Sequence, residues 1–266
     1  MPGLRDLHGQ GLRARGVQQQ GLHLGQNGPA RPGADDPRRF GALGDIHGAF
    51  GAARTIAARH SEIPFWLCVG DIADDHGGYE SIGARVYWIH GNNDNFDAIE
   101  ADNLPVDLFH IDNGTLVEIC QLGEPVVQVA GLGGTYAPTW YDTRGADLPH
   151  PQKGTAKATE LADKRRHFVR AEVEACKSLR DMIDVFMSHE AAKPFRPYPG
   201  GRGPDAGKAQ INEILASMKP RLHLFGHHHR FSDDIREGVR SVGLDLVTRS
   251  YLLIDAVSLE IELRTL

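Results

Sequence analysis

The sequence predicts an α/β (α+β) fold in which helices flank two packed, mixed β-sheets. Short apolar runs alternate with helical patterns early in the chain, which is typical of strands joined by helices. Pairs of runs with short connections follow in the middle and at the end, as in antiparallel hairpins. Several runs end in a polar piece led by Gly or Ser, which is typical of strands that deliver residues to a site.

The early elements alternate in type along the chain. Apolar runs too short for a helix predict strands at 40–43, 65–69 and 84–89, the first of which ends at Gly44. Residues 49–60 predict a helix with Ile56 and Ala57 on its apolar face, and residues 96–100 predict a short one.

The later elements include two expected hairpins. Asn113-Gly114 between two apolar runs is a strong hairpin signal, and the terminal runs form a second expected pair. The remaining apolar runs are predicted strands, and two patterns with apolar residues at helical spacing are predicted helices. The strands are 108–111, 115–119, 126–130, 182–187, 222–225, 251–254 and 259–263, and the helices are 159–179 and 209–218.

Residues 1–37 differ from the rest of the chain. They are rich in Gly, Arg, Gln and Pro and have no periodic apolar face, so they cannot bury enough surface to offset the entropy of ordering. We expect a disordered tail or an artefact of a start codon placed too far upstream. The folded domain is predicted to span residues 38–266.

Composition indicates a soluble, cytoplasmic protein without a membrane segment. The formal net charge of −6 gives no basic field that would favour nucleic acid. No apolar run approaches a membrane span, and the N-terminus lacks the apolar core of a secretory signal. Cys68, Cys120 and Cys176 are widely spaced, so we expect reduced, buried thiols.

Five polar pieces carry the chemistry. Taken singly, each is also explained as an ordinary turn, a buried histidine or a surface loop; taken together at strand ends, they indicate a site. The pieces are Gly44-Asp45-Ile46-His47-Gly48, Gly70-Asp71, Gly91-Asn92-Asn93-Asp94, Ser188-His189 and Gly226-His227-His228-His229. Their oxygen and imidazole donors suffice for two divalent metal ions, and such ligands suit Mn, Fe, Zn, Co or Ni.

The same five pieces, in this order, resemble the calcineurin-like metallophosphoesterase superfamily over roughly residues 40–231. The resemblance implies a four-layer αββα sandwich and hydrolysis of phosphoesters by in-line attack of a metal-bridging hydroxide. It also implies a division of the ligands. Asp45, His47 and His229 would hold one metal, Asn92, His189 and His227 the second, and Asp71 would bridge both.

The chain departs from the superfamily pattern at Asn93, where a histidine usually serves as general acid. An amide donates a hydrogen bond to a phosphoryl oxygen but cannot deliver a proton. We therefore expect Asn93 to contact the phosphoryl group and the enzyme to favour phosphodiesters. His228 and His76 are candidate replacements for the acid, and ordinary loop or supporting roles are the alternative for both.

A weaker resemblance concerns the catalytic domain of RNA lariat debranching enzymes. It rests on 91–96, the expected hairpin at Asn113-Gly114, the 133–136 turn and the basic run 164–167 on the expected helix. That family commonly has Cys at the position of Asp45 and keeps His at the position of Asn93. Debranching activity is therefore not transferred, although a nucleotide or RNA substrate remains open. The favoured interpretation of the basic run is a solvated helix face.

The substrate contacts and two other functions stay open from sequence. Arg196 and Arg202 lie in a Pro- and Gly-rich loop and either bind a substrate phosphate or are simply solvated. A phosphomonoesterase or protein phosphatase would use the same ligands, but Asn93 argues against it. A metal-binding docking module with little turnover is the alternative from another class. The sequence does not predict the oligomeric state.

Overall fold

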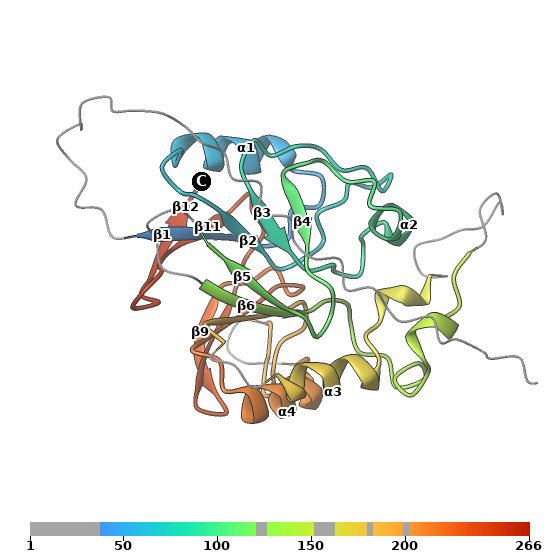
Figure 1. The fold of residues 1–266 in the computed structure, drawn as a ribbon. Coiled ribbons are helices and arrows are strands. Elements are labelled where there is room, and N and C mark those ends of the chain that lie inside the picture. The colour runs from blue at the N-terminus through green and yellow to red at the C-terminus, as the bar shows by residue number, and fades with distance from the viewer. Residues whose placement is uncertain (1–37, 121–126, 152–162, 180–182, 199–202) are drawn as a thin grey trace, which may run out of the picture. The chain divides into compact units, whose positions relative to one another are not determined.

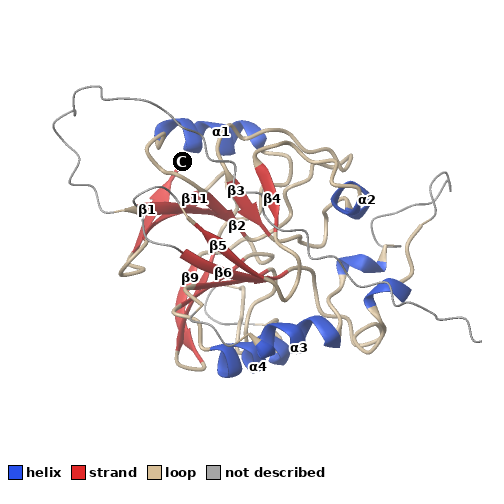
Figure 2. Ribbon diagram, in the orientation of Figure 1, coloured by secondary structure: helices blue, strands red, loops and turns tan. Residues whose placement is uncertain are grey.

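Two six-stranded sheets pack face to face and helices cover their outer faces, which confirms the predicted four-layer αββα sandwich (Figure 1). The structure is a computed structural model that describes residues 38–120, 127–151, 163–179, 183–198 and 203–266. The predicted tail, residues 1–37, lies outside the described residues. Figure 2 shows the helices on either side of the stacked strands.

The first sheet has the strand order β12-β11-β1-β2-β3-β4. β1 to β4 run parallel, β11 is antiparallel to β1, and β12 is antiparallel to β11. Leu43, Cys68 and Trp88 lie opposite one another, so β1, β2 and β3 end at the same edge. The strands are β1 (Arg39–Leu43), β2 (Trp66–Cys68), β3 (Val86–Trp88), β4 (Leu108–His110), β11 (Ser250–Asp255) and β12 (Ile261–Thr265).

The second sheet has the strand order β5-β6-β7-β8-β10-β9. β6, β7, β8 and β10 run parallel, and the edge strands β5 and β9 are antiparallel to their neighbours. Leu132, Ser188 and Phe225 lie opposite one another, so these parallel strands also end together. The strands are β5 (Leu116–Ile119), β6 (Val127–Leu132), β7 (Val185–Ser188), β8 (Leu222–Phe225), β9 (Ser232–Arg236) and β10 (Val239–Gly243).

The helices cover the two outer sheet faces. Phe50, Ala53 and Ile56 of α1 pack with Leu43 and Trp66 of the first sheet. α3 and α4 cover the second sheet in the same way (Figure 1). The α-helices are α1 (Phe50–Arg59), α2 (Phe96–Glu100), α3 (Arg170–Ser178) and α4 (Ala209–Met218), and short 3-10 turns lie at Gly145–Asp147 and Lys164–Arg166.

Alternate side chains of the central strands enter different cores. Phe40 and Ala42 of β1 point into the core between the sheets, whereas Leu43 points to the helix side. In the second sheet Met187 of β7 enters the inter-sheet core and Phe186 packs toward the helices. Because both faces are buried, these strands read as continuous apolar runs, and that made them recognisable in the sequence.

The hairpin predicted at Asn113-Gly114 is wrong. The strands on either side, β4 and β5, belong to different sheets. The Asn113 side chain accepts a hydrogen bond of 2.6 Å from the N–H of Gly133, and the Gly114 N–H bonds the carbonyl of Gly131. Gly114 has a φ of +73°, which glycine adopts without steric cost. The turn therefore passes the chain from one sheet to the other.

The helix predicted at 159–179 is shorter than expected. Residues 159–162 lie outside the described residues, Lys164–Arg166 form a 3-10 turn, and α3 begins only at Arg170. The basic run is not a solvated helix face, because the guanidinium of Arg165 forms ion pairs with Asp97 and Glu100 at 2.8 and 2.9 Å. These pairs join the 3-10 turn to α2.

The antiparallel pair β9–β10 has no counterpart among the predicted strands. Its turn residues Glu237 and Gly238 both have positive φ, 51° and 79°, as a two-residue hairpin loop requires. β9 carries Ser, Asp, Asp and Arg around a single Ile, so it lacks the apolar pattern of a strand. The other predicted elements agree with the structure within a few residues at their ends, including the terminal hairpin β11–β12.

Two further sequence expectations can be compared with the described residues. Cys68 and Cys176 are buried thiols as predicted, but Cys120 is exposed, because it follows the end of the edge strand β5. None of the described helices is both long and apolar enough to span a membrane.

Candidate metal centre

The sequence-predicted ligands meet at one edge of the two-sheet sandwich. Each follows the carboxyl end of a parallel strand, and these ends are aligned within each sheet. The first sheet supplies four of them and the second sheet three. Asp45 and His47 follow β1, Asp71 follows β2, Asn92 follows β3, His189 follows β7, and His227 and His229 follow β8.

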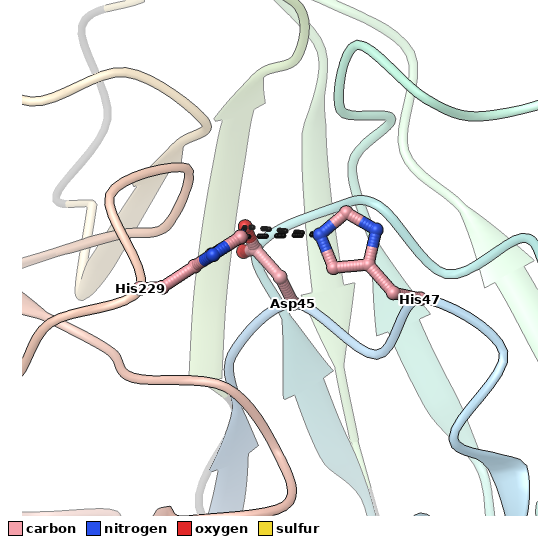
Figure 3. Close-up of side chains that lie close together, drawn as sticks. All are labelled: Asp45, His47 and His229. Atoms are coloured by element: carbon pink, nitrogen blue, oxygen red, sulfur yellow. Dashed lines mark hydrogen bonds and ion pairs between the residues drawn. The ribbon is translucent and has the colours of Figure 1, made fainter.

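Asp45, His47 and His229 form the first group (Figure 3). Their side chains point toward one another from two different sheets. His229 Nε2 lies 3.1 Å from both His47 Nε2 and Asp45 Oδ2. Asp45 is buried and its carboxylate also accepts the backbone N–H of His227 at 2.9 Å, which fixes its direction. One carboxylate and two imidazole nitrogens at this spacing could hold a metal ion.

Asp71, His189 and His227 form the second group. His189 Nε2 lies 3.5 Å from Asp71 Oδ2 and 3.1 Å from Asn92 Oδ1, and the His189 and His227 rings have centroids 4.9 Å apart. His189 Nδ1 lies 2.8 Å from the carbonyl oxygen of Val69, which can only accept a hydrogen bond. Nδ1 therefore carries a hydrogen, and Nε2 is the atom available to a metal.

Asp71 belongs to the second group and also faces the first. Its Oδ2 is 3.6 Å from His47 Nε2 in the first group and 3.5 Å from His189 Nε2 in the second. Its side chain is almost fully buried, so water cannot compensate the charge, and a buried carboxylate needs cationic or hydrogen-bonding neighbours. A single carboxylate oxygen thus faces both groups.

The backbone around the centre adopts unusual conformations. His47, Asp71, His227 and His229 all have positive φ, between 45° and 67°. Non-glycine residues in this region cost about 1–3 kcal/mol each, and such residues tend to cluster at functional sites. Gly91 permits a close approach, because a Cβ there would lie 2.0 Å from Asp71 Oδ1.

Asp94 holds the two loops of the first sheet together. Its carboxylate accepts hydrogen bonds from four backbone N–H groups, at 2.7 Å from Gly91 and at 2.9–3.0 Å from Asp71, Ile72 and Ala73. It thereby ties the loop that carries Asp71 to the loop that carries Asn92. Sequence reasoning assigned no role to Asp94, although it is the last residue of the third polar piece.

The charges of the centre are strongly coupled. Burial opposes a charge on His189, but the nearby carboxylates of Asp71 and Asp45 raise its pKa to about 10. Burial lowers the pKa of His227 to about 2. The hydrogen bond with Asp45 raises the pKa of His229. The carboxylates therefore favour positive charge at this edge, whether as a proton or as a cation.

The remaining predicted site residues are more dispersed. Asn93 contacts Asp71 directly, with its amide nitrogen 2.8 Å from Asp71 Oδ2. His228 is largely buried, with Nε2 3.9 Å from Glu190 Oε2, and His76 is exposed in the turn after Asp74. Arg196 is exposed, and Arg202 lies outside the described residues. The roles of all five as substrate or proton contacts stay predictions.

Glu190 and Lys208 are polar neighbours that sequence reasoning missed. Glu190 is 2% exposed; one carboxylate oxygen accepts the backbone N–H of Tyr136, and the other lies 3.3 Å from Lys208 Nζ. Glu190 directly follows the predicted ligand His189, and this adjacency was the available signal. Lys208 stands alone in a loop-like stretch, and nothing in its sequence surroundings connects it with the centre.

The fold and the clustered ligands define a metal-dependent phosphoesterase. A family model described as calcineurin-like phosphoesterase matches residues 38–231. The chain belongs to this family, whose members are hydrolases of phosphoesters that use divalent metals. The superfamily predicted from the five polar pieces is therefore confirmed.

Individual relatives are distant. The chain is 24% identical over 207 residues to the lariat debranching enzyme of Schizosaccharomyces pombe, which covers 69% of this chain but 42% of the relative. The chain thus matches less than half the length of that curated relative. The protein TT1561 of Thermus thermophilus is similar in structure, with a TM-score of 0.58, 14% identity, and 86% of this chain and 99% of that one covered.

A phosphopantetheinyl hydrolase from Mycobacterium tuberculosis is also similar in structure. The TM-score is 0.50 at 13% identity, with 79% of this chain and 90% of that chain covered. At such low identity the two structural relatives establish the fold and leave the substrate open.

Proposed function

We propose that the protein hydrolyses phosphodiesters with two divalent cations that share the Asp71 carboxylate. The observation that carries this proposal is the position of Asp71 Oδ2, 3.6 Å from His47 Nε2 and 3.5 Å from His189 Nε2. Two-metal phosphoryl-transfer sites hold their ions about 3.5–4 Å apart, which requires a shared ligand of this kind.

The donor set fits two cations. Asp45, His47 and His229 would hold one ion, Asn92, His189 and His227 the other, and Asp71 both. The hydrogen on His189 Nδ1 leaves Nε2 free to ligate, which is the arrangement that metal-binding histidines need. Bound ions would supply Lewis-acid polarisation of the phosphoryl oxygens and acidify a water nucleophile.

The preference for diesters rests on position 93. The Asn93 amide cannot protonate a departing alkoxide, and general acid catalysis typically contributes about 10²–10⁴ in rate. His228, between two of the proposed ligands, stays the candidate proton donor. The debranching relative acts on lariats by its printed name, so short RNA and dinucleotides belong among the diesters to be examined.

The test compares two substrates that share a leaving group. With Mn²⁺ added, we expect a higher kcat/KM for bis-p-nitrophenyl phosphate than for p-nitrophenyl phosphate. Asp71→Ala should lower diester hydrolysis by at least ~100-fold, because it removes a ligand of both ions. Asp75→Asn, an exposed carboxylate in the same loop, is the matched control and should retain the rate.

Each arm has a contrary outcome. A higher kcat/KM for the monoester would reject the diester preference and favour a phosphomonoesterase. Unchanged diester hydrolysis by Asp71→Ala would reject the site. Tight Mn²⁺ binding without hydrolysis of any phosphoester in a broad panel would favour a metal-binding docking module.

A further inference from the structure

Four side chains of the centre form a closed ring of polar contacts. Asn93 Nδ2 donates to Asp71 Oδ2 at 2.8 Å, and Asn92 Nδ2 donates to Asn93 Oδ1 at 2.9 Å. Asn92 Oδ1 lies 3.1 Å from His189 Nε2, which in turn lies 3.5 Å from Asp71 Oδ2. Three members of this ring are proposed ligands, and Asn93 is the fourth member.

The ring determines which end of each amide faces the centre. A carboxylate only accepts hydrogen bonds, so the group that Asn93 presents to Asp71 must be its NH₂. The Asn93 carbonyl then faces Asn92 and selects the NH₂ of that residue. As a result, the Asn92 carbonyl oxygen turns toward His189, and it is this oxygen that a metal requires.

The opposite orientation of Asn92 would disable it as a ligand. An amide NH₂ group has two hydrogen-bond donors and no lone pair for a cation. The amide carbonyl oxygen has two lone pairs and can therefore ligate a cation. The two ends of an amide have nearly the same shape, so packing alone does not discriminate between them. Hydrogen-bond partners must therefore fix the orientation of the Asn92 amide, and the adjacent Asn93 is such a partner.

We propose that Asn93 is a positioning residue that orients the ligand Asn92 and the shared carboxylate Asp71 for the second cation. This inference rests on the proposed two-cation site. It assigns to Asn93 a role in cation binding, through Asn92 and Asp71, in place of the direct contact with substrate expected from sequence. Residues that hydrogen-bond metal ligands typically contribute about 10–100-fold to metal affinity.

The experiment measures Mn²⁺ binding by isothermal titration calorimetry on the full chain after removal of metal. Intact protein should bind two ions. Asn93→Ala should bind the second ion about 10–100-fold more weakly. The first ion, at Asp45, His47 and His229 with the shared Asp71, should lose less affinity than the second, because Asp71 is the one proposed ligand of the first ion that bonds Asn93.

Repeating Asn93→Ala in an Asn92→Asp variant separates the loss of Asn92 orientation from general disruption of the site. In Asn92→Asp both side-chain ends are oxygens, so no partner is needed to choose between them. We expect Asn93→Ala to weaken the second affinity less in that background than in the intact protein, because only its contact with Asp71 is then left to lose. Asn93→Ser, too short to contact both neighbours, is used alongside in case the alanine variant does not fold.

Asn95→Ala is the matched control for the same loop. Asn95 caps α2 through Ala98 and bonds the carbonyl of Gly77, with no contact to the ring. This variant should lower the unfolding midpoint and leave both Mn²⁺ affinities unchanged.

The outcomes distinguish the inference from the function on which it rests. If Asn93→Ala lowers the affinity for the second ion equally in both backgrounds, the positioning role alone is overturned. The same holds if Asn93→Ala binds both ions as tightly as the intact protein. Intact protein that binds a single ion would overturn the two-cation proposal and the positioning role with it.

Discussion

Asn93 forms two hydrogen bonds with the carboxylate of Asp71: its backbone N–H donates to Oδ1 and its side-chain amide to Oδ2, both at 2.8 Å. The residue that replaces the usual acid of the family thus bonds the one carboxylate shared by both metal-binding groups. Under the proposed function, position 93 would affect both the protonation of the leaving group and the geometry of the centre.

Asn93→His should reduce the dependence of the rate on the leaving group. An imidazole can protonate the departing oxygen, whereas an amide cannot. For a series of aryl diesters at saturating Mn²⁺, we expect kcat of the intact protein to fall steeply as the leaving-group pKa rises, and kcat of the variant to fall less. The gain for the poorest leaving group should be roughly 10²-fold. Parallel slopes for the two proteins would show that the introduced imidazole does not reach the leaving oxygen.

Binding of Mn²⁺ should release a proton at pH 7. The carboxylates of Asp71 and Asp45 raise the pKa of His189 to about 10, so its ring is charged at neutral pH without metal. Ligation requires the neutral imidazole, and the proton must leave as the ion binds. Calorimetry in buffers of different ionisation enthalpy should give about one proton for the ion at His189, and its affinity should weaken as pH falls. Heats that are independent of the buffer would contradict this.

Asp94→Ala should destabilise the fold and abolish tight binding of the second ion, although Asp94 is not a proposed ligand. The substitution leaves four backbone N–H groups without their acceptor, and charged hydrogen bonds contribute about 1.5–3 kcal/mol each. We expect a loss of at least ~3 kcal/mol by urea unfolding. Asp74→Ala, which removes the acceptor of two N–H groups in a nearby turn, should cost less. Equal losses would show that burial of Asp94 adds nothing.

Acid should destabilise the protein through His223. This fully buried histidine bonds Ser188 and Ser241, and burial lowers its pKa to about 3 from 6.5. The pKa of His223 is lower in the folded state than in the unfolded state. The contribution of neutral His223 to the free energy of unfolding is therefore complete above pH 6.5 and is lost as pH falls toward 3. The free energy of unfolding should decline by up to about 1.4 kcal/mol per pH unit in that window on account of this residue.

His223→Gln tests this dependence. With metal removed by a chelator, the difference in slope between the variant and the intact protein isolates the titration of His223. A variant slope as steep as that of the intact protein would assign the acid sensitivity to other groups.

The local pattern of the sequence predicted which polar side chains cluster more reliably than it predicted the strand partners. Asp45, Asp71 and His189 were recognisable because each follows an apolar run, and aligned strand ends bring such residues together. The Asn113-Gly114 turn led to the wrong prediction that the two flanking strands pair, because only the turn conformation is local. Residues distant in the sequence determine that β5 pairs with β6. β9 was missed because an exposed edge strand does not require apolar residues.

The contacts among the site side chains could not be predicted from the sequence. Asn93 was recognised as a departure from the family pattern, but its bonds to Asp71 depend on the close approach of Gly91 to Asp71 and on Asp94. Glu190 and Lys208 meet only because α4 begins beside the loop after β7. Such contacts arise from tertiary packing, which residue spacing does not encode.

His47 and His229 are separated by 182 positions in the chain, yet their Nε2 atoms lie 3.1 Å apart. They come from different sheets, so the first metal-binding group exists only when the two sheets have docked. No fragment containing one sheet alone could reproduce it. During refolding, Mn²⁺ uptake at this group would therefore report the docking of the two sheets, and a truncated chain that lacks one sheet would not take up this ion.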